Sequence, residues 1–174
     1  MMRAGHGSGL ATGPESSVPD RFRLEYFAFR QLHHDAYLDY AQVRTGSRVR
    51  AVRCVETVFD RLRDIWQAAL RGSPAAQAWG MLHEQANCHS DCGAGHVWPI
   101  HCLLEGRQAD VVLLHRRLRL SVEEAADLMG VPDYTVRGLL RSADRALHAL
   151  PPCVAPVFTD ALYGRGAHGA SAAQ

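Results

Sequence analysis

The sequence predicts an all-α protein made of two small helical domains joined by a linker. Apolar residues recur at steps of three or four along most of the chain, which is typical of amphipathic helices, and no segment shows the alternation expected of a strand. A polar segment that contains glycine divides this helical pattern in two. The 174 residues suffice for two helical domains. The expected organisation is a flexible arm over 1–19, a first domain over 20–87, a linker over 88–99, a second domain over 100–150 and a tail over 151–174.

The first domain is expected to contain three helical segments. Apolar residues over 22–46 predict one or two amphipathic helices. A cleaner apolar stripe over 52–69 predicts the next helix, which the sequence Gly-Ser-Pro at 72–74 would end. A shorter helix is predicted over 74–85, because proline is tolerated in the first turn of a helix.

The second domain is expected to begin with a helix over 100–118 and to continue as a helix-turn-helix over 120–147. Ser121 and Glu124 have the spacing of a capping box, in which each side chain accepts a hydrogen bond from the backbone amide of the other residue. Gly130 would end the first helix of the motif, because glycine adopts a left-handed conformation at little cost. A second helix would then begin at Pro132 or the residue after it.

The second helix of this motif carries a row of arginines. They repeat every four residues on one face, while apolar residues occupy another face. Such a row suits a DNA groove, and the alternative is an ordinary helical hairpin whose arginines are solvated. The capping box, the turn glycine and the arginine row together favour DNA binding. The candidate DNA-contacting residues of this row are Arg137, Arg141 and Arg145.

The whole chain has almost no net charge. It contains 19 basic residues, all of them arginine, and 18 acidic ones, which gives a formal net charge of +1. This balance excludes a protein that is drawn onto nucleic acid by a strong overall field. Any contact with DNA phosphates is therefore expected to be local.

The second half resembles region 4 of bacterial sigma factors of the extracytoplasmic-function type. The resemblance covers about 100–150 and rests on three consecutive stretches, ADVVLLHRRLRLS, EEAADLMG and TVRGLLRSADRAL. Residues 29–67 are similar, more loosely, to sigma region 2, and Trp79 stands where that family keeps a tryptophan. Two helical domains joined by a linker are the architecture that this resemblance implies.

The resemblance implies an alternative sigma factor rather than an enzyme. Its implied partners are core RNA polymerase, promoter DNA and an anti-sigma factor or other regulator. The resemblance also implies that Tyr134 and Thr135 read the promoter together with Arg137 and Arg141. Trp79 would stack on a base of opened DNA, with core packing as the alternative. Arg50 and Arg53 stand where the family is typically acidic. That departure favours a second hypothesis, a sigma-like DNA-binding regulator that does not engage polymerase.

A cluster of cysteine and histidine residues surrounds the predicted linker. Cys88, Cys92, His96 and Cys102 are candidate ligands of a zinc ion, because thiolate and imidazole are the ligands that zinc prefers. The alternatives are reduced thiols with loop histidines, or a thiol switch. The cluster supports a third hypothesis, a zinc- or redox-responsive protein-interaction module. No other cofactor is expected.

The sequence contains no apolar stretch of about 18 residues, the length that crosses a membrane, and no hydrophobic leader. We therefore expect a cytoplasmic protein that does not engage the membrane.

Overall fold

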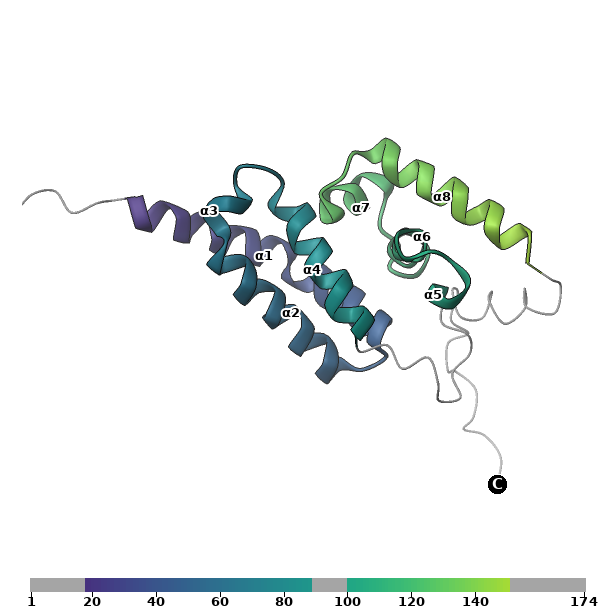
Figure 1. The fold of residues 1–174 in the computed structure, drawn as a ribbon, viewed down its shortest axis with the longest axis horizontal. Coiled ribbons are helices and arrows are strands. Elements are labelled where there is room, and N and C mark those ends of the chain that lie inside the picture. Colours follow the sequence, from purple (N-terminus) through teal and green to yellow (C-terminus); the bar gives the residue numbers. More distant parts are fainter. Residues whose placement is uncertain (1–17, 89–99, 151–174) are drawn as a thin grey trace, which may run out of the picture.

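The computed structural model describes residues 18–88 and 100–150. Every regular element in these two ranges is helical, which confirms the predicted all-α class. The first range forms the helices α1 to α4, and the second forms α5 to α8 together with the short π-helix η1 (Figure 1). Residues 1–17 of the predicted arm, residues 89–99 of the predicted linker and the whole predicted tail over 151–174 lie outside the described residues.

The first half begins with two long helices. α1 (Val18–Thr45) is one continuous helix, so residues 18 and 19, predicted to belong to the arm, are helical. Gly46 then adopts a left-handed conformation with φ of 65°, which turns the chain sharply. Ser47 caps α2 (Arg48–Asp64) by accepting a hydrogen bond from the Arg50 amide.

The helix predicted over 52–69 is interrupted at Ile65. α2 ends there, and a separate short helix, α3 (Trp66–Ala69), follows. The interruption directs Trp66 inward, where its ring lies 5.5 Å from Tyr26 and 5.3 Å from Phe29, while Ile65 stays partly exposed. The predicted apolar stripe is also wrong at Val52, which is 41% exposed, because the buried face of α2 runs through the neighbouring alanine and cysteine instead.

The last helix of the first half is longer than predicted. α4 (Pro74–Cys88) continues three residues beyond the expected end, so Cys88, predicted to open the linker, is still helical. Its first turn is capped by Ser73, whose hydroxyl accepts a hydrogen bond of 3.1 Å from the Ala76 amide.

The helix predicted over 100–118 consists of three pieces, α5 (Ile100–Leu103), α6 (Gly106–Val112) and η1 (Leu113–Arg117). At Gly106 a Cβ atom would lie only 3.0 Å from the His83 ring, so the chain passes close to α4 at this break. In η1 the helix widens, and the Leu118 amide bonds to the Leu113 carbonyl five residues earlier. Arg119 then adopts a left-handed conformation with φ of 62° and ends this segment.

The predicted helix-turn-helix is present as α7 (Val122–Met129) and α8 (Asp133–His148). Gly130 ends α7 in the left-handed conformation, with φ of 64°. The capping box between Ser121 and Glu124 is formed in full. These local predictions are confirmed because each depends only on residues adjacent in the sequence.

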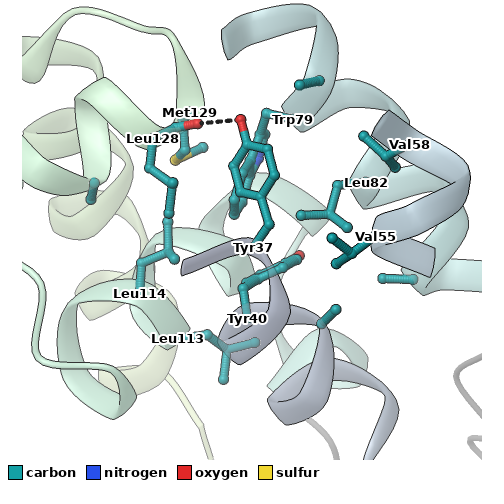
Figure 2. Packing of buried hydrophobic residues seen from close by; sticks show 14 of the residues in the cluster. Tyr37, Tyr40, Val55, Val58, Trp79, Leu82, Leu113, Leu114, Leu128 and Met129 are labelled. Carbon is teal, nitrogen blue, oxygen red and sulfur yellow. Dashed lines mark hydrogen bonds between the residues drawn. The ribbon is translucent and has the colours of Figure 1, made fainter. Parts of the chain in front are cut away.

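The two halves share one continuous hydrophobic core. Buried residues of α1, α2 and α4 join those of α6, η1, α7 and α8 in a single cluster. Figure 2 shows Tyr37 of α1 in the middle of this cluster, with its hydroxyl donating to the Leu128 carbonyl at 3.3 Å. The prediction of two domains joined by a linker is therefore supported only in its helical content, because the described halves do not have separate cores.

Candidate nucleic-acid interface

Helix α8 presents four of the five candidate DNA-contacting residues to solvent. Tyr134 is 71% exposed, and Arg137, Arg141 and Arg145 are exposed as well. The opposite face of the helix buries Val136 and Ala143 against the core. α8 thus has one packed face and one solvated basic face, as the sequence predicts.

Thr135 does not belong to this exposed face. It is half-buried, and it follows Tyr134 by one residue, which rotates its side chain by about 100° around the helix. Its backbone amide bonds to the Pro132 carbonyl at 2.9 Å and so completes the first turn of α8. The structure therefore separates Thr135 from the arginine row.

The three arginines of the row differ in their surroundings. Arg137 donates to Glu123 of α7 at 2.7 Å and to Asp133 at 3.2 Å, so two carboxylates neutralise its charge. Arg141 and Arg145 form no ion pair with any residue that the structure describes. They are consequently the two cations of α8 that are most available to a phosphate or a guanine base.

The start of α7 is fixed by its capping box. The Ser121 hydroxyl accepts from the Glu124 amide at 3.0 Å, and the Glu124 carboxylate accepts from the Ser121 amide at 2.7 Å. The hydrogen bond from the Ser121 amide, followed by the serine side chain, lowers the pKa of the Glu124 carboxyl. This cap places Glu123 within reach of Arg137. The ion pair between Glu123 and Arg137 then connects the start of α7 to α8.

The turn between α7 and α8 packs tightly against the first half. The Ser73 hydroxyl, which caps α4, also donates to the Gly130 carbonyl at 3.5 Å. A Cβ atom on Gly130 would lie 2.7 Å from the carbonyl carbon of Ala75 and closer still to the amide nitrogen of Ala76. The start of α4 therefore fixes the position of the turn, and with it the start of α8.

A buried carboxylate joins the two halves. Asp110 of α6 is fully buried and accepts hydrogen bonds from the Tyr40 hydroxyl at 2.6 Å and from the His83 ring at 2.7 Å. Burial, followed by the Asp110 charge, raises the pKa of the Tyr40 hydroxyl well above its ordinary value, so Tyr40 remains a donor. These bonds connect α1 and α4 to α6.

The hydrogen-bond network extends beyond Asp110. Because the Nδ1 atom of His83 donates to the carboxylate, its Nε2 atom is left to accept from the Asn87 amide at 2.8 Å. Asn87 in turn accepts from the buried guanidinium of Arg44. Sequence reasoning missed this network, and its one visible signal is an aspartate within the apolar run of 109–114.

Trp79, predicted as a contact for single-stranded DNA, is a core residue. It is only 5% exposed, and its ring lies 4.5 Å from that of Tyr40 and 6.0 Å from that of Tyr37 (Figure 2). In this arrangement no base can stack on it. Of the two alternatives that the sequence left open for Trp79, the burial favours core packing.

The predicted zinc ligands lie mostly outside the described residues. Cys92 and His96 fall in 89–99, and Cys88 is described only as the last residue of α4. Cys102 is exposed on α5. Within residues 18–88 and 100–150, no three His, Cys, Asp or Glu side chains lie together as a metal site would require. Across the same ranges, no helix has the length and apolar character needed to cross a membrane.

Comparison of the chain with protein-family models, with curated proteins and with solved structures gives no match. The structure by itself defines an all-helical protein with a helix-turn-helix whose second helix has an exposed basic face.

Proposed function

We propose that this protein is an alternative sigma factor, which binds core RNA polymerase and directs it to particular promoters. The observation that carries the proposal is the helix-turn-helix formed by α7 and α8. The exposed face of α8 carries Arg141 and Arg145, which form no ion pair with the described residues. A protein with this role is not an enzyme by itself, needs no cofactor, and works in the cytoplasm.

In this proposal α8 enters the major groove of the promoter. Arg141 and Arg145 provide hydrogen-bond donors for base edges or phosphates, and each specific contact of arginine with guanine is worth about 1 to 3 kcal/mol. The nearly neutral chain provides little non-specific affinity for DNA. Binding to polymerase would supply the remaining affinity for the promoter, because a helix-turn-helix that is tethered to polymerase meets its DNA site at high effective concentration.

A sigma-like regulator that binds DNA without polymerase is the second candidate function. The exposed arginines Arg50 and Arg53 on α2 favour it, because the sigma factors that the chain resembles are typically acidic on this helix. The burial of Trp79 also favours it, because opening a promoter requires aromatic residues that bases can reach.

Selection from a random pool of DNA duplexes tests the proposal. The full-length protein is used alone and in complex with core polymerase, and enriched duplexes are sequenced. A shared motif that appears only with polymerase, and that Arg141→Ala abolishes, supports the sigma factor. A motif obtained equally without polymerase supports the second candidate. Absence of any motif under both conditions contradicts sequence-specific DNA binding.

A further inference from the structure

An open groove lies at the end of the first half where α1 begins, on the left of Figure 1. Its walls are the first turns of α1 and the junction of α2 with α3, and its volume is about 720 Å³. The large apolar and aromatic lining residues are Phe22, Tyr26, Phe27, Ile65 and Trp66.

The groove exposes large apolar side chains to solvent. Of the lining residues, Phe27 is 55% exposed and Ile65 is 38% exposed. Large apolar side chains gathered in this way mark interaction surfaces. The indole N–H of Trp66 is buried and has no hydrogen-bond partner among the residues that the structure describes, although buried tryptophans usually find one.

The rim of the groove is basic. Arg23, Arg63 and Arg71 line it, against one acidic residue, Asp64. Arg63 is paired with Asp60 at 3.2 Å, whereas Arg23 and Arg71 form no ion pair within the described part of the chain. An occupant that complements this rim carries negative charge beside its apolar groups.

We propose that this groove binds an acidic amphipathic segment of a partner protein. The groove runs between two helical elements, so a third helix can place its apolar stripe on Phe22, Phe27 and Ile65. The basic residues belong to three separate segments, namely α1, the end of α2 and the residues after α3. Carboxylates spaced along a peptide match cations that are distributed in this way better than one lipid headgroup does. The proposal does not depend on the DNA-binding function.

The test begins with phage-displayed random peptides of about 16 residues, roughly four helical turns, selected on the immobilised full-length protein. We expect enriched peptides that carry Asp or Glu between apolar residues at helical spacing. A synthetic copy of the best peptide is then titrated by fluorescence anisotropy against the wild type and variants. Phe27→Asp and Arg71→Glu are each expected to weaken its binding by about tenfold or more.

Two matched variants serve as controls. Leu32→Asp changes an exposed apolar residue of the same helix α1, and Arg53→Glu changes an exposed arginine of α2, and neither residue lines the groove. Both variants should bind the peptide within about twofold of the wild type. Circular dichroism verifies that all four variants remain helical, and thermal melts compare their stability.

Several results would overturn the proposal. One is that no peptide is enriched, or that enriched peptides are basic or neutral. Another is that the groove variants bind the peptide as well as their controls do. Light scattering that shows dimers lost in Phe27→Asp would assign the groove to a second copy of this chain. Flotation with anionic phospholipid vesicles that depends on Phe27 and Arg71 would assign it to a membrane surface.

Discussion

At the scale of single residues, Gly130 combines two requirements that normally occur apart. Its positive φ of 64° favours a residue without a Cβ, and the start of α4 occupies the space where a Cβ would lie. Gly46 has almost the same φ, 65°, but nothing lies within 4 Å of its Cβ position. The two glycines therefore separate the effect of conformation from the effect of packing.

We expect Gly130→Ala to lower the free energy of unfolding by about 3 kcal/mol or more, because it adds a steric clash to the backbone strain. Gly46→Ala, which adds only the strain, is expected to cost about 1 kcal/mol. Urea unfolding monitored by circular dichroism measures both. Equal losses in the two variants would contradict the close contact between the turn and α4.

His33 makes stability depend on pH. Its ring lies 4.3 Å from that of Phe29 and 5.5 Å from that of Tyr37, and burial lowers its pKa below the ordinary value of 6.5. Below pH 6.5 the unfolded chain therefore takes up a proton more readily than the folded chain, so stability falls as the pH falls.

We expect His33→Gln to reduce this loss of stability. The free energy of unfolding, compared at about pH 7 and about pH 5, should change less in the variant than in the wild type. His148→Gln, at the exposed end of α8, is the control. In this variant the free energy of unfolding should change between the two pH values by the same amount as in the wild type. An identical pH dependence in wild type and His33→Gln would show that His33 is not the group responsible.

At the scale of elements, the basic face of α8 is the feature on which DNA binding depends. Arg141 is exposed and forms no ion pair with the described residues, whereas Arg137 is held by two carboxylates. Arg141→Ala should therefore leave the free energy of unfolding within about 0.5 kcal/mol of the wild type. It should weaken binding to the selected promoter by about tenfold, as measured by fluorescence anisotropy.

Arg137→Ala is expected to weaken the same DNA complex less, because Arg137 must first give up two ion pairs. If Arg137→Ala weakens DNA binding more than Arg141→Ala does, then Arg137 leaves its carboxylates and is the main DNA contact of α8.

The helix-turn-helix could be predicted from the sequence, and the breaks in the neighbouring helices could not. Ser121, Glu124 and Gly130 fix α7 through contacts with residues beside them in the chain. The interruption at Ile65 has no glycine or proline to mark it, and it accompanies the packing of Trp66 against α1, which is a contact between residues far apart in the sequence. The exposed arginines of α8 follow from its periodicity, whereas Thr135, which is half-buried, is suggested only by the sigma-factor resemblance.

At the scale of the whole molecule, the two halves are joined by the buried Asp110. Asp110→Ala would leave the Tyr40 hydroxyl and the His83 ring without their partner, at a cost of about 3 kcal/mol in the free energy of unfolding. Asp144→Ala is the control, because it removes a half-exposed carboxylate whose ion pair with Arg116 is worth less than about 1 kcal/mol. Similar costs for both variants, measured by urea unfolding, would contradict the role of Asp110.

This junction could not be predicted from the sequence. Tyr40, His83 and Asp110 are far apart in the chain, and each of them alone fits an amphipathic helix. The prediction of two helical halves came from local periodicity, which carries no information on how the halves meet.

The most direct test of the proposed function is gel filtration of the purified protein mixed with core RNA polymerase. The proposal predicts that the protein elutes with polymerase and that excess housekeeping sigma factor displaces it. If the protein elutes alone at every concentration tested, it is not a sigma factor, and the polymerase-independent regulator becomes the better description.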